Sequence, residues 1–583
     1  MIGAVLSLLV SFFVIRGFRF EFGAEVLVPR NTESFTWLLL FVLFARFFYL
    51  NFKNNNHRLK IYAAVFGLII GLFQVIGGCL EHMESVSRVW NDGKVAVNLT
   101  NMLFSYACVY YSFAFLAFRL LEQHSQENPR RAAGRMRMKS VLLIWLALIL
   151  CYVPWYLYFY PGILTYDSGA QVLEAVTPGY LSDHNPAFVT LLIRAVILPV
   201  MKAGGSVQLG IGICTLLQML IVTFVFSLSY IRICQYISNG FLRILFFVWF
   251  AFYPVHAIYS ITMWKDILFS VCLLAFTLCL DLCTEDEDAF FTGRKYCVFL
   301  FLCLLLLPLL RHNGIAVSVG MSLVFLFRFK RFRVKTALIC GAALLCFAGW
   351  KLILLPALHT EKGPSYELLN VPIQQISRVF FNHHRDLPPS LTAEAEAYFE
   401  PEFWEAYQEN IADPVKAKFN NHLFDSAPDR FWSLWRELGQ LYPGEFLDGF
   451  LMNNYGYWYP ETSWWITGIG VLINVPLEGV HQAPILRPVF MDKIYKWYYD
   501  REYNKTPVLP LFFKPGACFW VWLFCGFYCL YNNRRKFVLF LPCFLIWLTL
   551  QFSAVYCEFR YVYGLFTCLP LFLAAALSPV RKE

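Results

Sequence analysis

The chain has 583 residues, of which 58% are hydrophobic, 19% are aromatic and only 15% are charged, and its formal net charge is +9. A soluble protein of this length would be about one-quarter charged. The composition therefore excludes a soluble globular protein. Because long apolar runs recur from one end of the sequence to the other, a single cleaved signal peptide cannot explain them either. The sequence predicts an all-α polytopic membrane protein.

About fourteen apolar segments are predicted to be transmembrane helices, since crossing about 30 Å of hydrocarbon takes roughly 20 apolar residues. They are Met1–Phe18, Phe35–Leu50, Ile61–Leu80, Asn98–Phe118, Ser140–Tyr160, Val207–Tyr230, Phe241–Tyr259, Asp266–Cys283, Tyr296–Leu310, Gly314–Phe327, Thr336–Pro356, Leu511–Tyr531, Phe537–Val555 and Tyr561–Leu577. A further apolar stretch, Pro186–Lys202, is interrupted by Arg194 and Pro199. It is predicted to lie along the membrane interface as a helix.

Lysine and arginine collect in connections that this set of helices places on one side. These connections are Lys53–Lys60, Arg119–Lys139, Arg232–Arg243, Arg328–Lys335, Arg534–Lys536 and the terminal Arg581–Glu583. They are predicted to face the cytoplasm, together with both termini. The remaining connections are then external: Pro161–Asn185, Ser260–Lys265, Arg311–Asn313, Ala357–Pro510 and Tyr556–Arg560.

The long connection Ala357–Pro510 has 20 acidic and 12 basic side chains, a net charge of −8, so the rest of the chain carries +17. A basic membrane part with an acidic external segment is what positive-inside sorting produces, and it indicates no nucleic-acid partner. The external segment contains a predicted helix at Ala393–Asn410, an aromatic-rich run at Asn453–Trp465 and an apolar stretch, Ile466–Leu477, expected to rest on the membrane part.

Four units are predicted from this layout. Residues 1–139 form an N-terminal four-helix membrane unit with a basic loop, 140–356 a membrane module with its first external loop at 161–185, 357–510 an extracytoplasmic, mostly helical segment, and 511–583 a C-terminal three-helix unit. All 18 cysteines lie in or beside apolar runs, without zinc-binding spacing, which favours thiols packed in the core.

Four groups of polar residues interrupt the apolar sequence at predicted external helix ends. They contain Tyr166 and Asp167, Lys265 and Asp266, Arg311 and His312, and Glu558, Arg560 and Tyr561. Each group also has a purely structural explanation. In the same order, these are a helix cap, a snorkelling lysine, an arginine that meets lipid headgroups and a local ion pair. Together they place several cations and carboxylates on one face of the membrane. Ionisable groups near membrane depth are costly and usually serve a functional site.

The arrangement resembles the GT-C superfamily of membrane glycosyltransferases, which includes protein mannosyltransferases, aminoarabinose transferases and oligosaccharyltransferases. In these enzymes a catalytic Asp or Glu on the first external loop precedes one or two interfacial helices, an order matched by Asp167 and Pro186–Lys202. Bacterial members often have a His-Pro pair where the interfacial helix begins, and this chain departs by one residue, with His184-Asn185-Pro186. A later acidic position and a late external Arg-Tyr pair are matched by Asp266 and Arg560-Tyr561. The resemblance covers roughly 140–577.

The resemblance implies a bacterial enzyme of the cytoplasmic membrane that transfers a sugar from a polyprenyl-phosphate donor to an envelope polymer, lipid or protein. It implies Asp167 as the general base of an inverting transfer and binding of the donor phosphate by Lys265, Arg311, His312 and Arg560. Supporting roles are expected for Tyr166, Gln171, His184, Asp266, Glu558 and Tyr561. Apart from the donor, no cofactor is predicted. Some relatives use a divalent metal and others do not, and the ligands open to one here are Asp167, Asp183, Asp266 and Glu558.

Two further questions stay open at the level of sequence. Tyr455, Tyr457, Trp458 and Tyr459 could stack on sugar faces or form an interfacial aromatic belt. The function itself has alternatives: an O-antigen-type polymerase or ligase, a transporter or flippase of lipid-linked saccharides, and a non-catalytic scaffold of envelope assembly. A transporter would show charges at mid-membrane and paired repeats with broken helices, and neither is evident.

Overall fold

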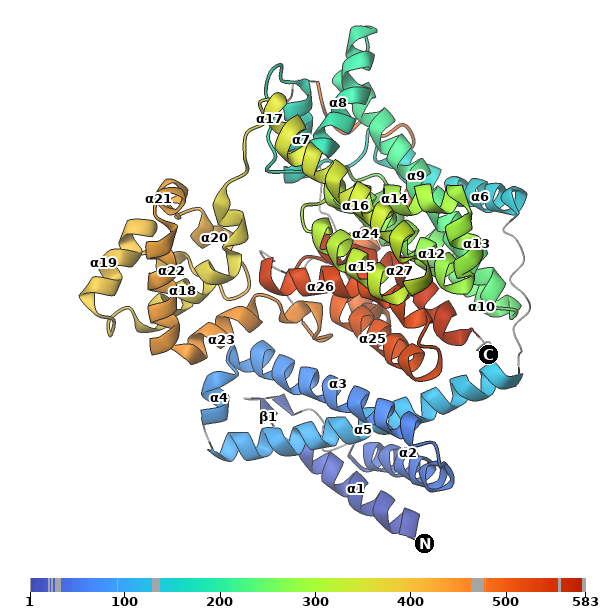
Figure 1. The fold of residues 1–583 in the computed structure, drawn as a ribbon. Coiled ribbons are helices and arrows are strands. Elements are labelled where there is room, and N and C mark those ends of the chain that lie inside the picture. The colour runs from blue at the N-terminus through green and yellow to red at the C-terminus, as the bar shows by residue number, and fades with distance from the viewer. Residues whose placement is uncertain are drawn as a thin grey trace.

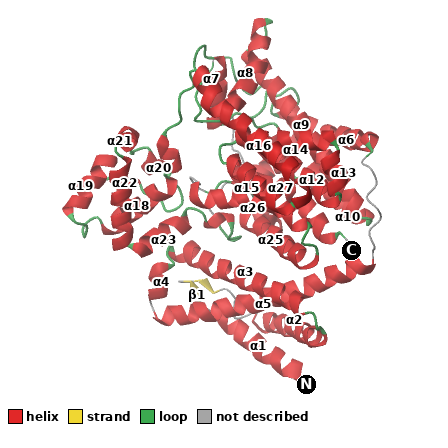
Figure 2. Cartoon of the chain, in the orientation of Figure 1, coloured by secondary structure: helices red, strands yellow, loops and turns green. Residues whose placement is uncertain are grey.

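The computed structural model describes residues 2–18, 21–22, 25–26, 33–91, 93–127, 137–462, 477, 479–553 and 557–578. Almost all of these residues are helical, and the strands drawn in Figure 2 are limited to one short antiparallel pair, β1 (Glu21–Phe22) with β2 (Glu25–Val26). Parts of several predicted features lie outside the described residues: 128–136 of the basic loop, 463–476 of the aromatic and apolar runs, Tyr556, and the terminal 581–583.

The first two predicted units are helical. The N-terminal unit contains α1 (Ile2–Phe18), α2 (Glu33–Lys53), α3 (His57–Met83), α4 (Ser87–Asn91) and α5 (Gly93–Glu127). The membrane module contains α6 (Met138–Tyr158), α7 (Tyr166–Val176), α8 (Ala187–Lys202), α9 (Val207–Tyr236), α10 (Gly240–Phe252), α11 (Pro254–Ser260), α12 (Lys265–Glu285), α13 (Glu287–Thr292), α14 (Arg294–Leu310), α15 (Gly314–Arg328), α16 (Arg333–Gly349), the π-helix η3 (Trp350–Leu354) and α17 (Leu355–Ala357).

The rest of the chain is also helical. The external segment contains α18 (Asn370–His383), α19 (Pro389–Tyr398), α20 (Asp413–Lys416), α21 (Asn421–Ser426), α22 (Pro428–Leu441), α23 (Pro443–Met452) and α24 (Val489–Tyr499). The C-terminal unit contains α25 (Pro515–Asn532), α26 (Leu541–Ser553) and α27 (Phe559–Leu577). Short 3-10 turns are η2 (Lys330–Phe332), η4 (Ser365–Leu368), η5 (Phe403–Ala406), η6 (Tyr455–Tyr457), η7 (Glu502–Lys505), η8 (Leu509–Phe513) and η9 (Lys536–Phe540).

The helical membrane class is confirmed, but the number of spans is not. Each of the fourteen predicted segments contains a helix, whereas seven helices among the described residues are long and apolar enough to cross a membrane, or eight if α10 and α11, bent by 41° at Pro254, form one broken span. Among the remaining predicted segments, α15 has 15 residues and α26 has 13, below the roughly 20 that a perpendicular crossing takes.

One hydrophobic core joins three of the predicted units. Buried residues of the N-terminal unit, the membrane module and the C-terminal unit belong to a single apolar cluster, with α25 between α3 and the module. The helices from α18 to α22 lie to one side in Figure 1 and have a separate core of their own. The membrane part is therefore one folded body, to which the external segment attaches.

A polar junction attaches the external segment to the N-terminal unit. The Asp448 carboxylate of α23 accepts hydrogen bonds from the Ser85 hydroxyl (2.6 Å) and the Val86 amide (2.8 Å), just before α4. Beside it, Arg378 of α18 pairs with Glu445 of α23 (2.9 Å) and donates to the Glu84 carbonyl (2.7 Å). Because these groups are buried and mutually satisfied, they fix how the segment sits on α3 and α4.

The predicted helix at Ala393–Asn410 is wrong in its second half. The helix α19 ends at Tyr398, and after a break the chain makes only the short turn η5. Pro401 explains the break, because a proline cannot donate to a helix and pushes the preceding residue into an extended conformation. Glu402 then adopts a left-handed conformation with φ 57°, just before η5.

Connections that the charge pattern assigns to the same side meet one another. On the predicted cytoplasmic side, Arg331 pairs with Asp288 (2.8 Å) and Lys536 pairs with Asp281 (2.6 Å). On the opposite side, the backbones of Ile163 and Thr262 form a parallel bridge, and those of Ser182 and Glu361 form another. Since α12 runs from Lys265, next to Thr262, to Glu285, next to Asp281 and Asp288, the two groups of loops lie at opposite ends of this helix.

Candidate functional site

Backbone pairing brings the first external loop beside the α11–α12 connection. The Ile163 amide donates to the Ile261 carbonyl (2.9 Å), and the Met263 amide donates back to the Ile163 carbonyl (3.1 Å). The approach requires glycine at position 162, where φ is 127° and a Cβ atom would lie 2.9 Å from the Ile261 oxygen. Asp167, in the first turn of α7, is thereby set next to Lys265 at the start of α12.

Three carboxylates and three cations from four helix ends form one network, here called the charge cluster. Its members are Asp167, Lys265, Asp266, Arg311, Glu558 and Arg560. One oxygen of Asp167 is 3.0 Å from Lys265 Nζ and 2.7 Å from Arg560 Nη1. Arg560 also reaches Glu558 (2.6 Å) and, at 3.8 Å, Asp266. Arg311 Nε lies 3.1 Å from the other oxygen of Asp266.

Aromatic rings enclose the two guanidinium groups. Arg560 lies 4.6 Å from the ring centre of Trp264, 4.9 Å from that of Tyr561 and 5.1 Å from that of Tyr166. Arg311 lies 4.7 Å from the Tyr561 ring. The Tyr166 hydroxyl donates to Glu558 (3.1 Å). Rings stabilise a cation without neutralising it, so both guanidinium groups keep their orientation and charge.

The charge cluster has a buried back and an open edge. The side chain of Asp266 is 0% exposed, and those of Arg560 and Glu558 are each 4% exposed. Asp167 and Lys265, at 20% and 16%, form the accessible edge. An incoming polar molecule would therefore meet Asp167 and Lys265 first, with the other charges fixed behind them.

The electrostatic setting keeps Asp167 ionised. Burial alone would raise its pKa, but the charges of Lys265 and Arg560 and their hydrogen bonds outweigh that effect, and the pKa falls well below its ordinary value. Asp167 is thus a firmly held carboxylate at neutral pH. Its basicity depends on how tightly the two cations hold it.

A second polar group adjoins the open edge. Lys351 of η3 forms an ion pair with Asp183 in the α7–α8 loop, and His312 Nε2 lies 3.0 Å from the Asp183 carbonyl oxygen. Lys265 donates to the Asn185 side chain, which joins this loop to the charge cluster. The surrounding protein, which partly desolvates the ring, and the charge of Lys351, with a smaller effect of Lys265, lower the pKa of His312.

Sequence reasoning missed the part played by Lys351 and Asn185, and it considered Asp183 only as a metal ligand. One signal was available: Lys351 is the single charged residue in the predicted span Thr336–Pro356. An ionisable side chain within a span is by default a candidate functional residue. The contact of Lys351 with Asp183 joins positions 168 residues apart and has no local signature.

Two of the predicted supporting residues lie away from the charge cluster. Gln171 is buried between α7 and α8, where its amide donates to the Thr190 hydroxyl (3.1 Å). His184 is exposed on the α7–α8 loop, and its backbone amide donates to the Ser182 hydroxyl (3.0 Å). Both residues shape the loop that carries Asp183 and Asn185.

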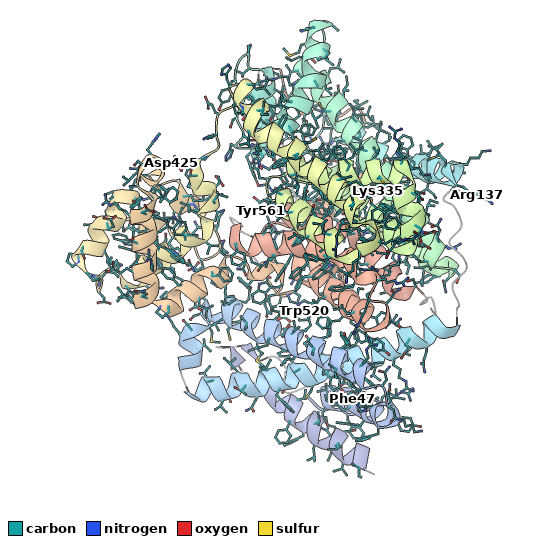
Figure 3. The ribbon with its side chains drawn as sticks, in the orientation of Figure 1. Phe47, Arg137, Lys335, Asp425, Trp520 and Tyr561 are labelled. Atoms are coloured by element: carbon teal, nitrogen blue, oxygen red, sulfur yellow. The ribbon has the colours of Figure 1, made fainter. Side chains whose placement is uncertain are left out.

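The aromatic run lies inside the protein. Tyr455, Tyr457, Trp458 and Tyr459 are all buried. Trp458 packs on Phe73 of α3, with ring centres 5.2 Å apart. Its backbone carbonyl accepts a hydrogen bond from the indole of Trp520 of α25, which Figure 3 marks between the N-terminal and C-terminal helices. In this arrangement the four rings present no open face to a sugar. Tyr457 instead supports the charge cluster, since its hydroxyl accepts from the Glu558 amide (3.2 Å).

The carboxylates do not form a metal site. Asp167, Asp183, Asp266 and Glu558 each lie against a lysine or arginine. Within the described part of the chain, no group of three or more His, Cys, Asp or Glu side chains is arranged to hold a metal ion. The residues present fit anion recognition through cations better than cation binding.

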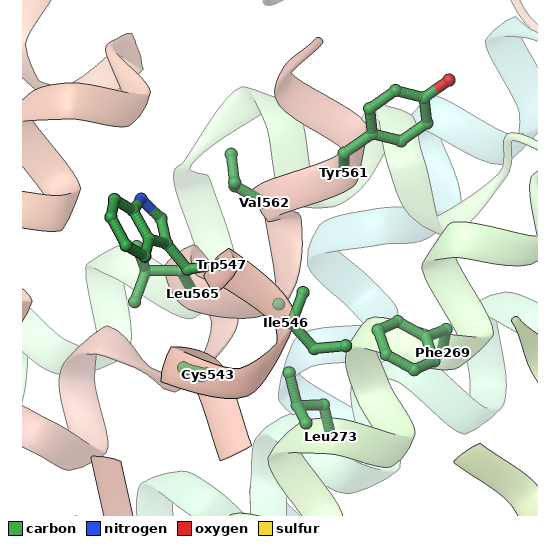
Figure 4. Close-up of a pocket in the computed structure, with 9 residues that line it drawn as sticks. Phe269, Leu273, Cys543, Ile546, Trp547, Tyr561, Val562 and Leu565 are labelled. Atoms are coloured by element: carbon green, nitrogen blue, oxygen red, sulfur yellow. The ribbon is translucent and has the colours of Figure 1, made fainter. Parts of the chain in front are cut away.

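A small apolar pocket lies beside the charge cluster, between α12, α26 and α27. Its lining includes Phe269, Leu273, Trp547, Tyr561 and Leu565. Figure 4 shows these side chains around the pocket, with the Tyr561 hydroxyl pointing away from it. Tyr561 therefore belongs to both features, because its ring also contacts Arg311 and Arg560. Apolar space thus begins directly behind the charged groups.

Comparison with known proteins gives a family but no named relative. The sequence matches no curated protein and no solved structure. A protein-family model matches residues 170–583, a range that includes Lys265, Arg311, Lys351 and Arg560 and begins three residues after Asp167. Since the match covers well over half of the chain, the protein belongs to that family, which is described as a family of unknown function (DUF6020).

Proposed function

We propose that the protein is an inverting membrane glycosyltransferase that uses a polyprenyl-phosphate sugar donor and acts on the extracytoplasmic face. The observation that carries the proposal is the convergence of Asp167 with Lys265 and Arg560 at the open edge of the charge cluster. A carboxylate and phosphate-binding cations at one point are what sugar transfer from a lipid phosphate requires.

A lipid-linked donor suits this location. Nucleotide sugars are confined to the cytoplasm, so a transferase that works outside needs a donor carried by the membrane. A polyprenyl-phosphate sugar keeps its chain in lipid while its phosphate and sugar reach the interface. The charge cluster stands at helix ends beside a small apolar pocket. The acceptor is an envelope polymer, lipid or protein that carries a free hydroxyl.

The chemical step follows from the ion pairs of Asp167. The Asp167 carboxylate takes the proton of the acceptor hydroxyl, whose oxygen attacks the anomeric carbon with inversion. The bond from that carbon to the phosphate oxygen breaks, and its electron pair stays on the leaving phosphate. The lipid phosphate gains one negative charge as Asp167 loses one, so the total charge is unchanged.

This exchange gives Lys265 and Arg560 a second role. Both cations lie within 3.0 Å of Asp167 while it is ionised. When Asp167 becomes protonated they lose that partner, and the charge that develops on the leaving phosphate can replace it. Cations positioned in advance commonly supply a few kcal/mol each of transition-state stabilisation, about 10²–10³ in rate.

Transfer by purified protein from defined polyprenyl-phosphate sugars tests the proposal. Asp167→Asn should lose about 10²–10⁴-fold in rate, the usual contribution of a general base, while donor binding persists because asparagine has a similar shape. Asp425→Asn, an exposed carboxylate of α21, serves as the matched control and should remain active. Full activity of Asp167→Asn would remove Asp167 as the base, and absence of transfer from every donor would remove the function.

A further inference from the structure

A second polar group, outside the charge cluster, has no role in the step described above. It consists of Lys351 and His312, with Lys265 on its border, arranged around the Asp183 segment of the α7–α8 loop. The side chain of Lys351 is 32% exposed, twice the value for Lys265, and His312 is exposed as well. Lys351 and Lys265 are the accessible cations next to Asp167, and His312 adds an imidazole ring whose lowered pKa favours the neutral form.

Each cation of the charge cluster is already paired with a carboxylate. Its three carboxylates balance its three cations, and Arg311 and Arg560 lie behind Asp167 and Lys265 with side chains 10% and 4% exposed. A phosphate that approaches from outside or from lipid cannot reach these guanidinium groups before it reaches the open edge. The first contacts of the phosphate must therefore come from Lys265, His312 and Lys351.

An apolar surface leads to Lys351. On the span that contains it, Leu345, Leu352 and Ile353 are each about 70% exposed. Trp350, next to Lys351, packs edge-on against Phe188 of α8, with ring centres 5.8 Å apart. Figure 1 shows α7, α8 and α17 side by side at the end of α16. A lipid chain lying along this surface would bring a phosphate at its head to the lysine.

Local backbone geometry supports the assignment. Lys351 lies in the π-helical turn η3, which interrupts the α-helical pattern between α16 and α17. Such turns are rare and occur often at functional sites, since the extra residue redirects the side chains around it. Here the turn sets a lysine at the outer end of a helix whose neighbouring side chains are apolar.

We propose that Lys351, His312 and Lys265 bind the phosphate of the lipid-linked donor, and that Asp183 holds Lys351 in place until the donor arrives. The inference rests on the proposed function, from which it takes the donor. It differs from the expectation that Arg311 and Arg560 contact the phosphate directly, because it assigns the first contacts to the two more exposed lysines and the His312 ring. The phosphate then displaces the Asp183 carboxylate from Lys351 and lies next to Asp167.

Binding of a long-chain polyprenyl phosphate to the full-length protein in phosphatidylcholine nanodiscs tests this site without any transfer step. Lys351→Gln should weaken binding about tenfold or more, since it removes a charge-assisted hydrogen bond to the phosphate. Asp183→Asn should tighten binding, because it removes the competing carboxylate but keeps an oxygen that can accept from the Ala187 amide. Lys362→Gln, an exposed lysine outside the group, should bind as the wild type does.

The two variants Lys351→Gln and Asp183→Asn are expected to change the affinity in opposite directions. This difference distinguishes a role in ligand binding from a purely structural ion pair. If the Lys351–Asp183 pair only held the loop, both variants would weaken binding, and that result overturns the proposal. Equal binding by wild type and Lys351→Gln also overturns it, while transfer activity in the same preparation leaves the proposed function standing. A wild type that binds no polyprenyl phosphate overturns both.

Competing ligands identify the source of the phosphate. Inorganic phosphate and phosphatidylglycerol should displace polyprenyl phosphate only at much higher concentration, since neither combines the phosphate with a polyprenyl chain. Equal competition by inorganic phosphate would mean a site for free phosphate. Equal competition by phosphatidylglycerol would mean a general site for anionic lipid. Either outcome overturns the assignment to the donor.

Discussion

At the scale of single residues, the main feature concerns the cations that keep Asp167 ionised. They also take part in the reaction that Asp167 is proposed to catalyse. A carboxylate whose pKa is held low is a weak base, which would be a poor choice if its surroundings stayed fixed. Lys265, however, is also proposed to contact the phosphate of the donor. As the phosphate draws Lys265 away, the pKa of Asp167 rises and the carboxylate becomes a better base.

The variant Lys265→Gln tests this coupling through pH. Asp167 acts as a base only when ionised, so the rate of transfer should fall as the pH drops through its pKa. Burial opposes ionisation, and the two cations keep the pKa low. Removal of one cation raises the pKa, and the acid limb of the kcat/KM profile should move to higher pH. The rate itself should also fall, by about 10²-fold.

The pH of the acid limb, rather than the rate of transfer, shows whether Lys265 controls the ionisation of Asp167. Lys202→Gln at the end of α8 removes an exposed lysine and should leave the limb unchanged. An acid limb in Lys265→Gln at the same pH as in the wild type would mean that Lys265 does not set the ionisation of Asp167, and the coupling would then be wrong.

The residues of the charge cluster could be predicted from the sequence because each interrupts an apolar run. Desolvation makes such interruptions costly, so Asp167, Lys265, Arg311 and Arg560 stood out without any structure. Their mutual contacts could not be predicted, since they depend on the pairing of the 161–166 loop with the α11–α12 connection. Lys351 was missed because its partner Asp183 is distant in sequence.

At the scale of elements, the N-terminal unit is held together by the close approach of two helices. Gly67 and Gly71 of α3 form a small-xxx-small motif, GLIIG, that faces α5. A Cβ atom at Gly67 would lie 2.5 Å from the Tyr111 backbone nitrogen, and one at Gly71 would lie 3.0 Å from that of Ala107. Small residues allow two helices to come this close within a membrane.

Gly67→Ala should therefore destabilise the protein, although alanine is the better helix former. The added methyl group overlaps the α5 backbone, and overpacking of this kind typically costs 1–3 kcal/mol. Gly341→Ala in α16 is the matched control: no atom lies within 4 Å of its added Cβ, so the change should be neutral or stabilising by up to about 1 kcal/mol. Unfolding of the purified variants in detergent measures both changes, and equal stability would contradict the close approach.

Helix positions were predictable from hydropathy, whereas helix lengths and breaks were not. Apolar runs mark where a helix must lie in lipid, and every predicted segment contains one. Hydropathy does not show where a helix ends, so α15 and α26 were taken as full spans. The break inside the predicted Ala393–Asn410 helix has a local cause, Pro401, which could have been recognised in the sequence.

At the scale of the whole molecule, the charge pattern and the contacts agree on how the connections group. Basic connections meet at one end of the module, and the loops of the charge cluster meet at the other. Because lysine and arginine are retained on the cytoplasmic side during insertion, we expect the charge cluster and the external segment to face the opposite compartment. A transferase that uses a lipid-phosphate donor outside the cell depends on this orientation.

Labelling of introduced cysteines with a membrane-impermeant maleimide tests the orientation. Asp425→Cys, at the outer edge of the external segment in Figure 3, should react in intact cells. Arg331→Cys, on an exposed turn between α15 and α16, should react only after the membrane is permeabilised. Among the 18 native cysteines, only Cys346 is exposed. It lies in an apolar span that should keep it in lipid, so background labelling should be low. The reverse pattern would place the charge cluster in the cytoplasm, where nucleotide sugars are available and a lipid-linked donor is not needed.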